Sequence, residues 1–128
     1  MIYTVQTKQD IATIKDELAS KAKEIGFGVL NTYAFKKILA DKGFPIKKDI
    51  TVYELCNPPG AQDALSHLAE ISVYLPCRLS IYEENGKTTL ATIGFEDMLD
   101  AVEVDDNFKA HMTIIFENLK RVMHSWDN

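Results

Sequence analysis

The spacing of hydrophobic side chains along the chain shifts between about two and about 3.6 residues, which predicts strands that alternate with helices. Residues 2–6 and 49–56 alternate between apolar and polar positions, as strands with one buried face do. Residues 27–35 alternate in the same way, although Asn31 interrupts the apolar row. The apolar side chains of this strand are predicted to share one face and are Phe27, Val29, Tyr33 and Phe35.

Two further strands are predicted to form a hairpin. Residues 74–84 and 87–95 are rich in β-branched and aromatic side chains, and Asn85 and Gly86 separate them. An asparagine followed by a glycine tolerates the positive φ angles of a type I′ turn. We therefore expect the two strands to be antiparallel neighbours.

Apolar residues at helical spacing predict helices between and after these strands. The first helix follows Thr7, whose hydroxyl is predicted to cap it, with Asp10 as the acceptor three positions on. A short helix runs to Gly43, and another begins at Asn57 and Pro58, a favoured N-cap residue followed by proline at the first helical position. A short helix lies near Met98, and a long amphipathic helix starts near Asp106. The predicted buried stripes of the three longer helices are Ile11, Ile14, Leu18, Ala22 and Ile25; Ala61, Ala64, Leu65, Leu68 and Ile71; and Phe108, Met112, Ile115, Leu119, Val122 and Trp126.

Five strands and a long terminal helix favour an α+β fold, with a five-stranded antiparallel sheet and helices packed on one face. The chain of 128 residues shows no linker, internal repeat or low-complexity tract, so we expect residues 1–128 to form a single domain. A chain of this length can bury roughly two-thirds of the surface of its unfolded form. It needs neither disulfides nor a structural metal to build a core.

Charge narrows the range of partners. The chain carries 14 Lys and Arg against 19 Asp and Glu, a net charge of −5, which argues against a nucleic-acid partner. No apolar run approaches the ~20 residues that span a bilayer, and residues 1–6 show no basic segment followed by an apolar one. We therefore expect a cytoplasmic protein without a membrane partner. Lysines gather in residues 36–48 and acids in residues 96–106, and we interpret both clusters as solvated faces.

The two cysteines carry the most specific chemical signal. Cys56 immediately precedes Asn57, so its thiol is predicted to lie near the positive end of a helix, where the pKa of a thiol falls. Cys77 is followed by Arg78, but alternation along a strand points these two side chains to opposite faces. Glu54 shares a face with Cys56, and its carboxylate would raise the pKa of that thiol or accept its proton.

The two cysteines are also compatible with roles that need no reactive thiol. Free cysteine is often a buried, inert residue, so both could be packing residues. Cys56 and Cys77 are 21 positions apart, which fits neither a Cys-x-x-Cys redox motif nor a four-ligand zinc site. His67 follows Cys56 on the same predicted helix but lies roughly 15 Å along its axis from the N-terminus, too far for a Cys-His couple within that helix. We therefore predict no metal site and leave the cofactor unknown.

Two segments around the cysteines resemble a known family. Residues 53–58 read Tyr-Glu-Leu-Cys-Asn-Pro and residues 75–78 read Leu-Pro-Cys-Arg. Together with residues 23–30, they resemble the bacterial and archaeal family catalogued as domain of unknown function 302. The resemblance implies a small, usually dimeric protein with a sheet and gripping helix similar to TATA-box-binding-protein-like folds, and it implies no established reaction. The chain departs from the family pattern at Pro59-Gly60 and in the acidic helix after Phe95.

Three hypotheses about function follow. In the first, the protein is a homodimeric binding module, with a cavity at the two cysteine motifs that takes a small hydrophobic or thiol-reactive ligand. In the second, it is a thiol-dependent enzyme or sulfur carrier with Cys56 as the nucleophile. In the third, it is a structural or interaction protein with packed cysteines. The candidate ligand-binding or reactive residues are Glu54, Cys56, Asn57, Cys77 and Arg78.

Overall fold

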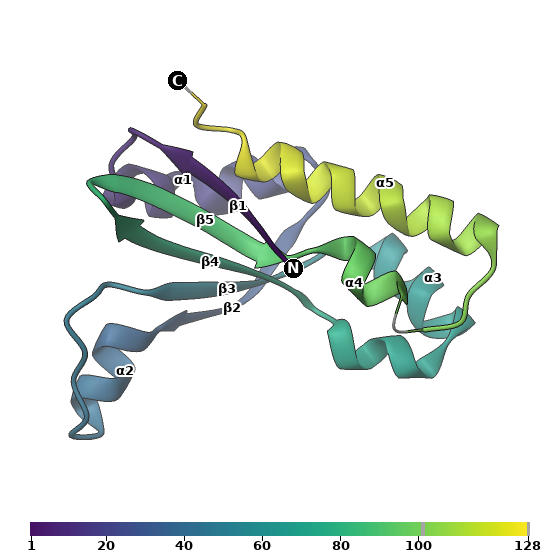
Figure 1. Cartoon of the computed structure of the whole chain (residues 1–128), viewed down its shortest axis with the longest axis horizontal. Helices are drawn as coiled ribbons and strands as arrows, with labels where there is room; N and C mark the ends of the chain where they lie inside the picture. Colours follow the sequence, from purple (N-terminus) through teal and green to yellow (C-terminus); the bar gives the residue numbers. More distant parts are fainter. Residues whose placement is uncertain (101, 128) are drawn as a thin grey trace.

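In the computed structural model, which describes residues 1–100 and 102–127, the strands form a five-stranded antiparallel sheet with the order β1-β5-β4-β3-β2 (Figure 1). The predicted α+β class is confirmed. The strands are β1 (Ile2–Thr7), β2 (Gly28–Ala34), β3 (Thr51–Cys56), β4 (Cys77–Glu84) and β5 (Lys87–Ile93). The helices are α1 (Ile11–Glu24), α2 (Phe35–Asp41), α3 (Pro58–His67), the 3-10 helix η1 (Ala69–Tyr74), α4 (Phe95–Asp100) and α5 (Asp106–Met123).

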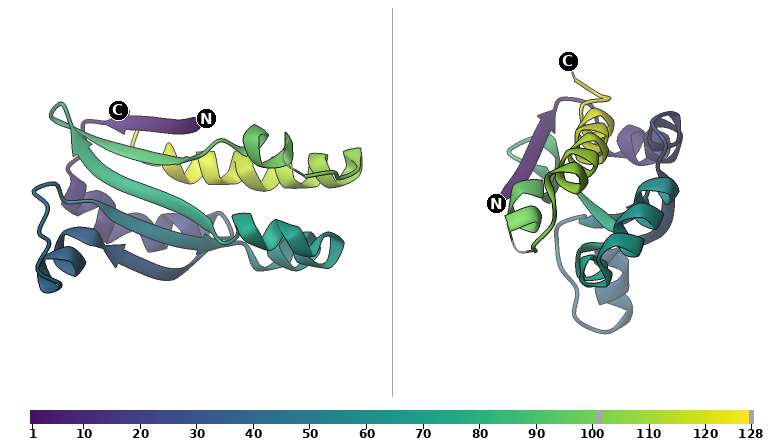
Figure 2. Two further views of the ribbon diagram at one scale, coloured as in Figure 1. Left: turned by 60° about the horizontal axis from the view of Figure 1, so that its bottom comes forward. Right: turned by 90° about the vertical axis from the view of Figure 1, so that its right-hand side faces the viewer.

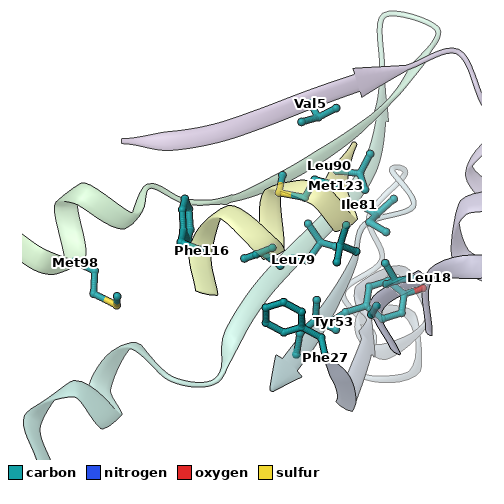
Figure 3. Close-up of a cluster of buried hydrophobic side chains, with 14 of the residues drawn as sticks. Val5, Leu18, Phe27, Tyr53, Leu79, Ile81, Leu90, Met98, Phe116 and Met123 are labelled. Atoms are coloured by element: carbon teal, nitrogen blue, oxygen red, sulfur yellow. The ribbon is translucent and has the colours of Figure 1, made fainter. Parts of the chain in front are cut away.

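The core lies between one face of the sheet and the helices α1 and α5. Alternate residues of β4, Leu79 and Ile81, are fully buried and share one hydrophobic cluster with Leu18 of α1 and Met123 of α5 (Figure 3). Leu90 of β5 and Leu55 of β3 complete the row across the sheet. The sheet face that these residues share is called the core face below, and the opposite face is called the outer face.

The hairpin of β4 and β5 follows the sequence prediction. Asn85 has a φ of 55° and Gly86 a φ of 76°, the two positive values that a type I′ turn needs. The register pairs Glu84 with Lys87 across this turn and continues as far as Ser80 and Ala91. Both strands extend past this last pair, so their far ends are splayed.

The N-terminus of α1 differs from the prediction. Asp10, not Thr7, is the N-cap residue, and its carboxylate accepts a hydrogen bond of 3.0 Å from the backbone N–H of Thr13. The hydroxyl of Thr7 instead donates to the backbone carbonyl of Trp126 at 2.7 Å. The strand β1 extends to Thr7, so this residue is engaged in the sheet before the helix begins.

A β-bulge in β2 overturns the predicted single apolar face of that strand. Val29 pairs with Leu55, but Asn31 pairs with Glu54, so Leu30 is the extra residue. The bulge shifts the alternation by one position. Val29 therefore lies on the core face, whereas Asn31 and Tyr33 lie on the outer face.

The helix after Asn57 is shorter than predicted. It ends at His67, and Ile71 lies in the separate 3-10 helix η1, although it is fully buried as expected. The following strand begins at Cys77 instead of Tyr74. As a result, α3 and η1 project beyond the end of the sheet beneath α4 and α5 (Figure 2, left). None of the helices in the described residues is long and apolar enough to cross a membrane.

Candidate functional site

The register of β3 and β4 separates the candidate residues into two groups. Leu55 pairs with Cys77, whereas Glu54 pairs with Arg78. Directly opposed residues of two antiparallel strands point to the same face. Cys77 therefore lies on the core face with the buried Leu55, and Arg78 lies with Glu54 on the outer face, as the alternation of the sequence predicts for Cys77 and Arg78.

On the core side, the end of the sheet opens into a cavity of about 240 Å³, called the larger cavity. Strands β2 and β3 form one wall, α3 and η1 form another, and α5 closes it. Both cysteines and Asn57 line it. The full lining is Phe27, Leu30, Leu55, Cys56, Asn57, Gly60, Ala61, Leu65, Ser72, Leu75, Pro76, Cys77, Met112 and Ile115.

A smaller cavity of about 130 Å³ adjoins it on the side of α4. Five residues line both cavities, so the two spaces adjoin at these side chains: Leu75, Pro76, Cys77, Met112 and Ile115. The rest of the smaller cavity is lined by Val73, Tyr74, Arg78, Thr92, Ile93, Met98, Phe116 and Leu119. Cys77 thus stands at the junction of two mainly apolar spaces.

The thiol of Cys77 is protonated at neutral pH. Burial, and to a smaller degree the neighbouring Cys56, raises the pKa of this thiol to about 11. A protonated thiol is a weak nucleophile and behaves as a small apolar group. In this position Cys77 extends the apolar lining of both cavities.

Cys56 and Asn57 connect the strand β3 to the helix α3. The side-chain oxygen of Asn57 accepts a hydrogen bond of 2.8 Å from the backbone N–H of Gly60, which confirms Asn57 as the N-cap residue. Its side-chain nitrogen donates to the carbonyl of Gly26 at 3.3 Å. Cys56 is half-buried, carries a free thiol and lines the larger cavity at the N-terminus of α3.

Glu54 lies away from both cavities, which corrects the expectation that it joins the two thiols. The side chain is only 8% exposed, and it accepts hydrogen bonds from the hydroxyl of Tyr33 at 2.8 Å and the amide of Asn31 at 3.2 Å. The Nε of Arg78 donates to the other carboxylate oxygen at 3.4 Å. These hydrogen bonds, first of all that of Tyr33, lower the pKa of Glu54 and raise the pKa of Tyr33. The bulge explains the grouping, because it brings Asn31 and Tyr33 to the outer face.

Because the pKa of Glu54 is lowered, its contribution to the free energy of unfolding should depend on pH. A carboxyl group with a lowered pKa in the folded state stabilises the protein at pH values above its ordinary value of 4.5, and this stabilisation disappears as the pH falls through the folded value. We expect Glu54→Gln to be less stable than the native protein at pH 7 and nearly equal to it well below pH 4.5. Urea unfolding of both proteins between pH 2 and pH 7 measures the difference, and a difference that is constant across this range contradicts the prediction.

His67 and His111 connect helices, His124 contacts the hydroxyl of Tyr3 in β1 at 2.7 Å, and none of the three is in the described lining of the cavities. The Nε2 of His67 lies 3.5 Å from the carboxylate of Asp105, and its ring packs 4.8 Å from that of Phe108. His111 of α5 lies 3.4 Å from the carboxylate of Asp63 in α3. Across residues 1–100 and 102–127, no three His, Cys, Asp or Glu side chains are grouped so that they could hold a metal ion.

Sequence reasoning identified the two cysteines that line the cavities, but it did not identify most of the apolar residues that form the cavity walls. Met112 and Ile115 were predicted only as part of the apolar stripe of α5, and Leu75 as part of a strand. Their spacing gives no sign that they face an open space, because a side chain that lines a cavity has the same periodicity as one that fills a core. The Leu-Pro-Cys-Arg segment was the available signal, since it places Leu75, Pro76 and Cys77 together at the junction.

The comparisons with known proteins agree with this fold. Residues 3–126 match a family model described as "Domain of unknown function DUF302". A crystal structure of an uncharacterized conserved DUF302 protein from Bacillus stearothermophilus is similar to this chain, with a TM-score of 0.88 and 26% sequence identity. The similarity covers 98% of this chain and 97% of that one. The search of curated proteins returned no match.

Proposed function

We propose that this chain, which belongs to the DUF302 family, is a binding module that holds a small apolar ligand in the two adjoining cavities. The observation that carries the proposal is the apolar space at the end of the sheet, between the pair α3 and η1 and the helix α5. Together the two cavities reach the lower end of the range of small-molecule sites, roughly 300 Å³. Such sites combine a mainly apolar lining with a few polar groups.

The openings of the cavities support this proposal. Leu30 and Leu65 line the larger cavity and are exposed, and Val73 and Ile93 line the smaller cavity and are exposed as well. Apolar side chains at the rim of an apolar cavity mark a surface that is covered when a ligand binds.

Thiol chemistry at Cys56 is the second candidate function. Cys56 has a free thiol and lines the larger cavity at the N-terminus of α3, where a reactive ligand could meet it. The protonated thiol of Cys77 supports a binding role in preference to a pair of reactive thiols. Both cysteines are free, as in proteins of reducing compartments, and we propose a cytoplasmic location on that ground. The mass of the intact protein as purified tests the second candidate, since a sulfur carrier holds an adduct that Cys56→Ser removes.

We further propose that the protein is a homodimer. The strand β1 lies at one edge of the sheet, and its Ile2 is 60% exposed. On α5, Ile114 is 62% exposed. An open sheet edge or an exposed apolar helix position can pair with the same surface of a second copy about a two-fold axis. Light scattering should give twice the chain mass of 14.4 kDa, and a mass of one chain contradicts the dimer.

The binding of 1-octanol, a neutral molecule with a flexible apolar chain, tests the proposed function by titration calorimetry. Ala61 lines the larger cavity and is half-buried, so Ala61→Met places a longer side chain in that space. We expect the native protein to bind the alcohol and Ala61→Met to bind it roughly fivefold more weakly, because the added side chain occupies the site. The matched control is Ala19→Met, at an exposed position of α1. Failure of the native protein to bind, or equal binding by a folded Ala61→Met variant, contradicts the proposal.

A further inference from the structure

We propose that the two cavities form one elongated site for a fatty carboxylate with a single acyl chain, whose chain lies in the cavities and whose carboxylate meets Arg78. The inference rests on the proposed function and names the class of ligand. Three features of the site carry it: the wall that the two cavities share, the place where the smaller one opens, and the charge at that opening.

The two cavities meet at the side chains of the junction. Both cavities are bounded by Leu75, Pro76 and Cys77 on one side and by Met112 and Ile115 on the other. Met112 has an unbranched, flexible side chain that can change rotamer at low cost. The protonated thiol of Cys77 brings no charge to the path. An acyl chain is narrow and flexible enough to pass such a junction, whereas a rigid ring system of the same volume is not.

The smaller cavity opens where β4 and β5 separate. Their ladder ends at Ser80 and Ala91, although β4 begins at Cys77 and β5 runs to Ile93. Beyond the ladder, the hydroxyl of Thr92 in β5 donates to the backbone carbonyl of Arg78 in β4 at 2.6 Å, and Arg78, Thr92 and Ile93 line the smaller cavity here. The side chain of Arg78 is 72% exposed, so its guanidinium group lies in solvent at the rim of an apolar space.

Arg78 is the one charged residue in the described lining of the two cavities. The carboxylate of Glu54 accepts a hydrogen bond from its Nε at 3.4 Å and offsets part of its charge, and this contact does not use the terminal nitrogens of the guanidinium group. A guanidinium group that is held in this way presents two parallel N–H donors, the arrangement that binds a carboxylate in bidentate fashion. In a chain with a net charge of −5, a cation at the opening of an apolar site selects an anionic head group with an apolar tail.

Titration calorimetry below the micelle concentration tests the inference with three probes: dodecanoate, dodecanol and butyrate. The native protein should bind dodecanoate more tightly than dodecanol, which has the same chain without the charge, and should not bind butyrate, which has the charge without the chain. Arg78→Met should weaken dodecanoate binding by about tenfold or more, because it removes a charge-assisted contact, and should leave dodecanol binding unchanged. The affinity of Arg78→Lys for dodecanoate should lie between those of the native protein and Arg78→Met, because lysine keeps the charge but loses the bidentate geometry.

The matched control is Arg121→Met, which changes the net charge equally at an exposed position of α5 that lines neither cavity. It should bind dodecanoate as the native protein does. If dodecanol binds as tightly as dodecanoate, or if Arg78→Met and Arg121→Met have the same effect, the assignment of the carboxylate is wrong while the apolar binding function stands. If neither long-chain probe binds, both proposals are wrong. Dodecanol binding also reports whether Arg78→Met is folded.

Discussion

Iodoacetamide at neutral pH should modify Cys77 roughly 100-fold more slowly than it modifies an unperturbed cysteine. Burial raises the pKa of this thiol from its ordinary value of 9.0 to about 11, and only the thiolate reacts. Two pKa units correspond to about a hundredfold smaller thiolate fraction at a pH below both values. The rate should therefore keep rising with pH up to about 11. Mass spectrometry of tryptic peptides after timed labelling measures each site separately.

Cys56 provides the internal comparison for this experiment. Both thiols are half-buried, but the pKa of Cys77 is raised, so we expect Cys56 at the N-terminus of α3 to be labelled before Cys77 in the folded protein. The variants Cys56→Ala and Cys77→Ala assign each rate to one thiol. In urea both sites should react at the rate of a free cysteine. Fast labelling of Cys77 at pH 7 in the folded protein would show that its thiol is not enclosed between the cavities.

Replacement of Leu79 by alanine should lower the free energy of unfolding by about 3 kcal/mol, within the range of ~2–5 kcal/mol for a buried leucine. Leu79 is fully buried on the core face of β4, opposite Tyr53. The change removes apolar contacts with the sheet and with the helices and leaves a void that the packed core fills only in part. Urea unfolding monitored by circular dichroism measures the loss.

Leu30 is the matched control for that substitution. It also lies in a strand of the sheet, but its side chain is 56% exposed at the rim of the larger cavity. Leu30→Ala should change the free energy of unfolding by about 0.5 kcal/mol or less. A loss at Leu79 no greater than that at Leu30 would contradict the assignment of the core face.

The local features of the fold could be predicted where a short motif determines the backbone. Asn85 and Gly86 specify their turn through the φ angles that they tolerate, and Asn57 with Pro58 specifies the start of α3. The prediction failed for Thr7, because two residues near one helix start can both act as caps and tertiary contacts decide between them. Thr7 remains in β1, where its hydroxyl donates a hydrogen bond to the carbonyl of Trp126, and Asp10 is the N-cap residue of α1.

The site could be predicted only in part. Alternation correctly placed Cys77 and Arg78 on opposite faces, because both lie within one regular strand. It could not show that Glu54 accepts a hydrogen bond from Tyr33, because the bulge at Leu30 reverses the faces of the residues that follow. The cavities themselves depend on where α3 ends and on how η1 and α5 are spaced, and these properties arise from packing between distant segments.

Diffraction from crystals soaked in 1-iodohexane tests the central claim, that the end of the sheet holds an apolar ligand, most directly. The iodine atom scatters anomalously, so its position is found independently of the rest of the probe. We predict an anomalous peak inside the cavities beside Cys77 and Met112, and its loss from the larger cavity in Ala61→Met. Crystals that show ordered water in place of the probe in both cavities, or iodine only on the outer surface, would contradict the account.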